Sequence, residues 1–329
     1  MLKIKVGWHL HTEDKNKYDR KVRYEDIVNG VKDEFGCIYS LDRKRLLQGA
    51  EDLLYYTIKD SVEVICDNAF MHCSLLEKVS LPESVKLIGD TPFTKYTKVE
   101  SLSKRFVVED DFLIDLHTGR LIHYLDNGKT DITIPELVKW IGNAAFMECN
   151  SLENVVMPNT VKVIGDMAFG GCTSLKNIVL SNSLERIERN AFLFCLSLKS
   201  IVLPERLSFI GVPNFDRGLD IISLSKHFVV EDGLIIDKDN NKLIICTSNH
   251  TEVYIPSTVT SIGRVAFWGC MSLQTIVLPN SLETIEESAF IGCRYLQNIF
   301  IPQGKREYFE ELLQENGNGE VISKLKEIE

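Results

Sequence analysis

The feature that most constrains this chain is a phenylalanine that recurs at a fixed interval. Five residues before each of these phenylalanines stands an isoleucine, from Ile65 to Ile285. Most successive pairs are 23 residues apart, and two pairs are 53 and 52 residues apart. A fixed period in this range is typical of a solenoid, in which each coil buries its apolar side only against its neighbours. The sequence therefore predicts a solenoid of eight repeats, with these phenylalanines in its core: Phe70, Phe93, Phe146, Phe169, Phe192, Phe215, Phe267 and Phe290.

The two long spacings contain a second kind of module. GLIIDKDNNKLI, at residues 233–244, resembles DFLIDLHTGRLI at 111–122 and GCIYSLDRKRLL at 36–47. Each module has two short apolar runs around a polar turn, which is the pattern of a β-hairpin. We therefore expect a hairpin to be inserted into the array at three places.

Composition and charge exclude several classes of function. The chain has 329 residues, and its net charge of −10 comes from 47 acidic and 37 basic residues that are interspersed. Nucleic-acid binding would need a basic stripe, so we expect no nucleic-acid partner. No apolar run approaches the roughly 18 residues of a membrane span. The first residues lack the apolar core of a signal peptide, which favours a cytoplasmic protein. The alternative is a surface or secreted protein whose leader lies outside this sequence.

Six of the nine cysteines share one position of the repeat, three residues after the marker phenylalanine. Tyr96 and Gly218 hold that position in the other two repeats. A cysteine in such a column behaves as a small apolar core residue, so we expect buried thiols rather than disulfides or a metal site. The six are Cys73, Cys149, Cys172, Cys195, Cys270 and Cys293.

Each repeat also contains the pattern LxxIxL, which predicts a short strand. The residue between the last two apolar positions points away from the core, so these residues should form a row on the open face of a sheet. Counted ten residues after the phenylalanine, the row contains Ser80, Ser103, Val156, Val179, Val202, Ser225, Val277 and Phe300. A neighbouring column contains Asn154, Asn177, Ser200, Thr275 and Asn298. We consider Val156, Val179, Val202, Val277, Phe300 and this polar column candidate protein-binding residues. The alternative is that valine is there for its strand propensity alone.

The two segments LKSIVLPERLSFIGVPNF (198–215) and LQTIVLPNSLETIEESAFIGCRYL (273–296) resemble the BspA-type leucine-rich repeats, an LRR_5-like family. The resemblance covers roughly residues 36–315. It implies a leucine-rich repeat solenoid, a right-handed coil of 23-residue repeats with a parallel sheet on its concave face. It also implies no catalytic motif. The family is widespread in gut and oral Bacteroidetes, and some of its members are surface adhesins that bind host proteins.

The ends of the chain depart from the period. We expect an N-terminal cap region over residues 1–35, repeats over 36–302 and a helical C-terminal cap over 303–329. Within the caps, alternation from Leu2 to Leu10 predicts a strand, and residues 27–35 a short helix. An amphipathic helix is expected from Gly304 to Leu313, and a last helix from Val321 to Ile328.

Little in the sequence points to catalysis or to a bound metal. Asp237, Asp239 and Asn241 begin like a calcium loop, but glycine and glutamate are missing from the required later positions, which favours a polar hairpin turn. His9 and His11 could share one side of a strand, without a third ligand nearby. No hydrolase or phosphate-binding motif occurs, so we expect no enzyme and no cofactor. Two hypotheses remain: a binding module for a protein partner, which includes self-association, or a structural or adhesin-type repeat protein without a single defined ligand site.

Overall fold

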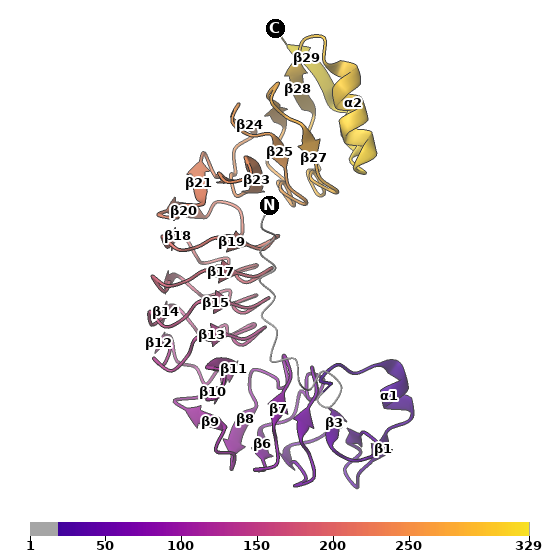
Figure 1. Cartoon of the computed structure of the whole chain (residues 1–329), viewed down its shortest axis with the longest axis vertical. Helices are drawn as coiled ribbons and strands as arrows, with labels where there is room; N and C mark the ends of the chain where they lie inside the picture. Colours follow the sequence, from indigo (N-terminus) through magenta and orange to yellow (C-terminus); the bar gives the residue numbers. More distant parts are fainter. Residues whose placement is uncertain (1–18, 329) are drawn as a thin grey trace, which may run out of the picture. The chain divides into compact units, whose positions relative to one another are not determined.

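The computed structural model describes residues 19–328, which form two compact units, divided between His117 and Thr118: residues 19–117 (unit 1) and 118–328 (unit 2). The predicted strand from Leu2 to Leu10 and the pair His9 and His11 lie outside the described residues. Throughout both units the chain alternates between two kinds of short strand (Figure 1). One kind carries the LxxIxL pattern, and the other ends on the isoleucine that precedes the marker phenylalanine.

Unit 1 contains strands of both kinds, each in its own sheet. The LxxIxL strands form a parallel sheet in the order β4-β6-β8, with bounds Tyr55–Thr57, Lys78–Leu81 and Lys98–Ser101. The second sheet has the order β1-β2-β3-β5-β7, with bounds Val31–Lys32, Ile38–Tyr39, Arg45–Gln48, Val64–Ile65 and Leu87–Ile88. A further antiparallel pair joins β9 (Phe106–Glu109) to β10 (Phe112–Asp115).

Unit 2 repeats this arrangement over more coils. Its LxxIxL strands are β12 (Asp131–Thr133), β14 (Asn154–Val156), β16 (Asn177–Val179), β18 (Ser200–Leu203), β20 (Asp220–Ser223), β24 (Glu252–Tyr254), β26 (Thr275–Val277) and β28 (Asn298–Pro302). Its isoleucine strands are β11 (Arg120–Tyr124), β13 (Trp140–Ile141), β15 (Val163–Ile164), β17 (Arg186–Ile187), β19 (Phe209–Ile210), β23 (Lys242–Cys246), β25 (Ser261–Ile262) and β27 (Thr284–Ile285). Strands β21 (Phe228–Glu231) and β22 (Leu234–Asp237) precede β23. In Figure 1, β13, β15, β17 and β19 lie on one side of this part of the solenoid, and β12, β14 and β18 on the other.

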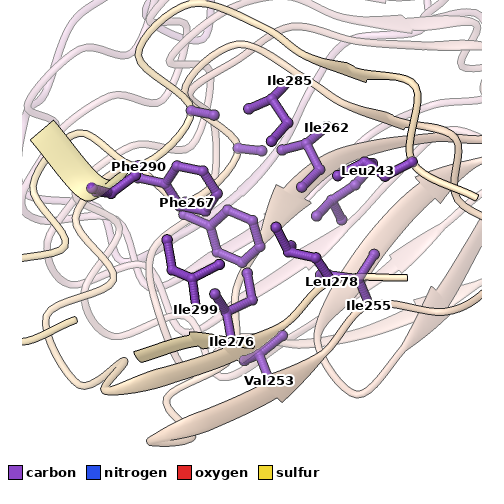
Figure 2. Packing of buried hydrophobic residues seen from close by; sticks show 14 of the residues in the cluster. Leu243, Val253, Ile255, Ile262, Phe267, Ile276, Leu278, Ile285, Phe290 and Ile299 are labelled. Carbon is purple, nitrogen blue, oxygen red and sulfur yellow. The ribbon is translucent and has the colours of Figure 1, made fainter. Parts of the chain in front are cut away.

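The core of each unit is a ladder of the marker phenylalanines. All eight are at most 3% exposed, which confirms the prediction from their period. In unit 2, Phe146 stacks on Phe169 with ring centroids 4.7 Å apart, and Phe169 on Phe192 at 5.5 Å. Figure 2 shows the same arrangement for Phe267 and Phe290, whose rings lie between isoleucines of the two kinds of strand. The coil spacing of a parallel sheet matches the distance at which aromatic rings stack, so one phenylalanine per coil builds a continuous core.

Hydrogen bonds from coil to coil hold the turns in an unusual conformation. The residue two before the marker phenylalanine has a positive φ in seven of the eight repeats: Asn68, Thr91, Ala144, Met167, Asn190, Val265 and Ser288. Such a φ costs a non-glycine residue on the order of 1 kcal/mol. The amide of Ala144 donates to Asp166 O of the next coil at 2.8 Å, and Met167 N donates to Arg189 O at 2.9 Å. These bonds recur along the array and offset the strain.

Two of the inserted modules are hairpins, as predicted: β2 pairs with β3, and β22 with β23, both antiparallel. The third module supplies β10 and β11. The pattern had not predicted that β21 adds a further antiparallel strand to β22. Asp232 and Gly233, both with positive φ, connect these two strands in a tight turn of the kind that such backbone angles require.

Two expectations for the ends of the array were wrong. The helix expected over residues 27–35 is instead α1 (Tyr24–Val28), followed by strand β1. At the other end α2 (Arg306–Glu315) is the expected amphipathic helix and buries Phe309, Leu312 and Leu313. The last expected helix is instead a 3-10 turn, η1 (Gly319–Lys324), and then strand β29 (Leu325–Ile328). The last apolar residues form a strand instead of a helix because β29 pairs in parallel with β28 and continues its sheet.

Candidate protein-binding face

Three consecutive valines that were predicted to point outward from the LxxIxL strands of unit 2 do so. Val156 pairs with Val179 across β14 and β16, and β16 contacts β18, which carries Val202. Val156, Val179 and Val202 are 42%, 58% and 45% exposed, whereas their strand neighbours Val155, Ile178 and Ile201 are buried. The next residue of this row is Ile222, which pairs with Val202 and is 51% exposed. Val156, Val179, Val202 and Ile222 together are called the valine row.

Ile222 replaces Ser225, which the sequence had placed in the row. In the same way Ser80 pairs with Glu100, not with Ser103. Both Ser103 and Ser225 are buried, and Ser225 Oγ donates to Leu207 O at 2.7 Å. The physical reason is that these two coils are shorter, so counting from the phenylalanine gives the wrong register. The LxxIxL pattern would not have identified Ile222 either, because its match at residues 219–224 places Ile222 in the core; the pairing of β18 with β20 establishes its outward position.

The polar column beside the valine row is a ladder of side-chain hydrogen bonds. Asn177 Nδ2 donates to Asn154 Oδ1 at 2.7 Å, and Asn154 Nδ2 donates to Asp131 Oδ1 at 2.7 Å. Hydrogen bonds from Thr130 and Asn154 hold the pKa of Asp131 below its usual value. The amide groups thus bind one another along the sheet, which supports a structural role for Asn154 and Asn177. Ser200, the next residue of the column, is exposed at the start of β18.

A second row follows further along unit 2, where Tyr254 pairs with Val277 and Val277 with Phe300. Tyr254 is 64% exposed, and Val277 and Phe300 are half-buried. We call these three residues the tyrosine row. Its polar neighbours include Asn298, whose Nδ2 donates to Thr275 Oγ1 at 3.3 Å. Tyr254 was missed because it belongs to a hairpin module, although it occupies the outward position of a strand-like run.

The corresponding face of unit 1 is charged. Lys78 and Glu100 form an ion pair at 2.8 Å across β6 and β8. The Tyr55 hydroxyl donates to Glu77 Oε2 at 2.8 Å. Outward apolar rows on the LxxIxL sheets are therefore a property of unit 2, and we restrict the candidate face to that unit.

The other segment of the repeat carries charged residues seven positions before the phenylalanine, and several of these form ion pairs between coils. Glu63 lies between Lys44 and Lys86, at 2.9 and 3.0 Å. Hydrogen bonds from these two ammonium groups lower the pKa of Glu63 to about 2. Lys162 and Glu185 form a similar pair at 3.1 Å. These contacts join neighbouring coils.

The structure contains all nine cysteines as buried thiols. In the repeat column, Cys172 donates to Phe146 O and Cys195 to Phe169 O, so each thiol bonds to the backbone of the preceding coil. Burial raises the pKa of Cys66 to about 11 and that of Cys73 to about 12. Such thiols are poor nucleophiles and poor metal ligands. Within residues 19–328, no group of three or more His, Cys, Asp or Glu residues is arranged to hold a metal ion.

The geometry agrees with a comparison against families of known proteins. A model described as "BspA type Leucine rich repeat region" matches in six copies, over residues 44–106, 124–228 and 241–328. The chain belongs to the BspA-type leucine-rich repeat family. This membership confirms the resemblance and the solenoid fold predicted from the 23-residue period. The matched model describes a repeat region, and membership in the family does not identify a ligand for this chain.

Solved structures of bacterial leucine-rich repeat proteins are similar to this one. A leucine-rich cell surface protein from Faecalibacterium prausnitzii is 24% identical over 80% of this chain and 63% of its own, with a TM-score of 0.44. A leucine-rich repeat protein from T. pallidum is 28% identical over 61% of this chain and 81% of its own, with a TM-score of 0.34. The pneumococcal vaccine antigen PcpA is 19% identical over 84% of this chain and 68% of its own, with a TM-score of 0.46.

No curated protein matches the chain. Among the described residues, no helix has the length and apolar character needed to cross a membrane.

Proposed function

We propose that this leucine-rich repeat protein is a non-enzymatic binding module and that the valine row is its contact site for a protein. The observation that carries the proposal is a set of four apolar side chains, each 42% to 58% exposed, on the consecutive strands β14, β16, β18 and β20 of two neighbouring sheets. An exposed apolar patch rimmed by polar groups is typical of protein contact sites. The tyrosine row, on the separate sheet that contains β24, β26 and β28, adds the aromatic residues Tyr254 and Phe300, a residue type that protein interfaces favour.

The alternative function, a structural or adhesin-type repeat protein without a defined ligand site, also has an observation in its favour. The amide ladder of Asn154 and Asn177 uses the polar groups of the face for stability along the sheet. A face whose polar groups are already hydrogen-bonded offers fewer of them to a ligand. This observation limits the proposal to the apolar side chains and takes the asparagines out of direct recognition.

The test compares variants at one register position. Val179→Glu combined with Val202→Glu places two charges in the valine row, and the fold should survive because both side chains lie outside the core. Ser80→Glu is the matched control, since it adds a charge at the same position of the charged face of unit 1.

Self-association is measured by sedimentation and light scattering of the purified chain. Contact with another protein is measured by cross-linking followed by mapping of the linked strands. We expect the double variant, and not Ser80→Glu, to lose the association or the cross-links on β14 to β20. A folded double variant that associates and cross-links as the wild type does would show that the valines serve strand propensity alone.

A further inference from the structure

The opposite side of the solenoid carries another outward row, in which each residue directly precedes a buried isoleucine. In unit 2 this row follows the pairing of β13, β15, β17 and β19. Successive residues of a strand point to opposite faces, so the side chains next to Ile141, Ile164, Ile187 and Ile210 point outward. They are Trp140, Val163, Arg186 and Phe209, which we call the tryptophan row.

The same row in unit 1 is covered by the chain itself. There Arg45 pairs with Val64 and Val64 with Leu87, in the register that Arg120, Trp140 and Val163 have in unit 2. Val22 and Ile27, from the segment that includes α1, pack on this face. Under this cover Val64 is only 1% exposed.

Polar contacts fix the covering segment on unit 1. Arg45 Nη2 donates to Lys21 O at 2.7 Å, and Arg45 Nη1 lies 3.8 Å from Asp26 Oδ1. At the start of the segment, Arg20 Nη1 lies 3.0 Å from Asp90 Oδ1. Residues 20–27 thus combine two apolar side chains, a carboxylate and a backbone carbonyl, and these groups match an outward row of arginine and aliphatic residues.

The tryptophan row combines the same kinds of side chain, an arginine and apolar residues, and its apolar residues include two aromatic rings. Arg186 lies over the Phe209 ring at 3.8 Å, and Arg120, the counterpart of Arg45, lies over Trp140 at 5.4 Å. All four residues of the row are half-buried, whereas Val64, the counterpart of Trp140, is buried.

We propose that the tryptophan row is a docking site for a short peptide segment of a protein partner that carries two apolar side chains and a carboxylate. The model for the bound segment is residues 20–27 of this chain on unit 1: two apolar side chains five positions apart, with a carboxylate just before the second. The carboxylate pairs with the Nη groups of Arg186, whose Nε is paired with Glu188 at 2.9 Å. Arg, Trp and Phe are the residues that contact sites enrich. This site uses the other face of the solenoid and does not depend on the valine row.

The proposal is specific to one stretch of unit 2. Further along, the same outward positions hold Lys242, Ser261 and Thr284. Lys242 pairs with Glu286 at 2.6 Å, and Thr284 Oγ1 donates to Ser261 Oγ at 2.7 Å. These polar side chains already pair or hydrogen-bond with neighbouring residues, so an apolar segment would have no apolar surface to pack against there.

The experiment titrates the full chain with a synthetic peptide of residues 20–29, which has no tryptophan. Replacing Trp8 and Trp268 by phenylalanine leaves Trp140 as the single tryptophan, and its emission reports on the tryptophan row. We expect a saturable blue shift. A peptide with Val22→Ser and Ile27→Ser should bind at least about tenfold more weakly, because the buried apolar contacts are lost.

Variants of the protein locate the site. Val163→Glu and Arg186→Glu should each weaken binding at least about tenfold, whereas Val179→Glu, on the opposite sheet, should leave it unchanged. Circular dichroism establishes that each variant is folded, and Arg186→Glu suffices if Val163→Glu does not fold. The absence of a saturable shift would overturn the proposal, as would wild-type affinity in the folded row variants. Neither result would affect the proposal for the valine row, which is tested by Val179→Glu and Val202→Glu.

Discussion

The phenylalanine ladder makes a quantitative prediction at Phe192. This ring is 1% exposed and stacks between Phe169 at 5.5 Å and Phe215 at 5.9 Å. Phe192→Ala removes on the order of 150 Å² of buried apolar surface, which at about 25 cal/mol per Å² is about 4 kcal/mol. This value lies within the range of about 3–5 kcal/mol for truncating a buried phenylalanine. Both stacking contacts are lost together, so the coils on either side should be destabilised as well.

The assay has two parts, because a repeat array need not unfold in one step. Denaturant unfolding followed by circular dichroism gives the loss of stability. Hydrogen exchange by mass spectrometry shows where protection is lost, and we expect it in the coils of Phe169, Phe192 and Phe215. An unfolding curve that matches the wild type would refute the predicted core. A loss of protection confined to the coil of Phe192 would refute the coupling between coils.

Phe194→Gly is the matched control, two residues away in the same turn. Phe194 is 51% exposed and has a φ of 63°, a conformation that disfavours large side chains. The neighbouring coil has Gly171 at this position, with a φ of 76°. Relief of strain and loss of partial burial nearly cancel, so this variant should stay within about 1 kcal/mol of the wild type.

Three further predictions test the contacts between coils and the cysteines. Because Glu63 has its pKa lowered to about 2, its ion pairs add stability that is fully present above the ordinary glutamate pKa of about 4.5 and is lost as the pH falls through about 2. The melting-temperature difference between Glu63→Gln and the wild type should therefore be largest near neutral pH and vanish near pH 2; a constant difference would contradict this assignment. Asn154→Ala removes two hydrogen bonds of the amide ladder and should lower the free energy of unfolding, measured with denaturant, by about 1 kcal/mol. A variant as stable as the wild type would contradict this prediction. Titration with a thiol reagent should count nine thiols after denaturation without reductant and only slow reaction before it, and a shortfall traced to a linked peptide would establish a disulfide.

The sequence predicted the parts of the fold that repeat. The isoleucine and phenylalanine positions each have one physical role in every coil, so their period identified the core and the solenoid. The turns were less predictable. The residue two before the phenylalanine has a positive φ although it is Ala144, Met167 or Val265, residues that rarely adopt it. At Ala144 and Met167 a hydrogen bond to the next coil holds this conformation, and no local sequence signal reports a contact with a residue 22 positions away.

The candidate faces were predictable only in part. The valines were identified because alternation within a strand is local. The tryptophan row was missed because its strands are two residues long, too short for alternation to be recognised. Its significance also depends on a contact that sequence alone does not show, the packing of Val22 and Ile27 on the equivalent residues of unit 1.

The error at Ser103 and Ser225 shows what sets the register of the solenoid. In a regular coil, Val79 follows Phe70 by nine residues, whereas in the short coils Val99 follows Phe93 and Ile221 follows Phe215 by six. The short coils are those without a cysteine three residues after the phenylalanine, where Tyr96 and Gly218 stand instead. The strands nevertheless pair so that a buried residue lies beside the buried residue of the next strand, Val79 beside Val99 and Ile201 beside Ile221, regardless of the length of the turn between them. The valine row therefore continues without a break from Val202 to Ile222. A shortened turn changes what lies at the edge of the sheet and leaves its outward face continuous, so a partner that covers the valines must also contact Ile222.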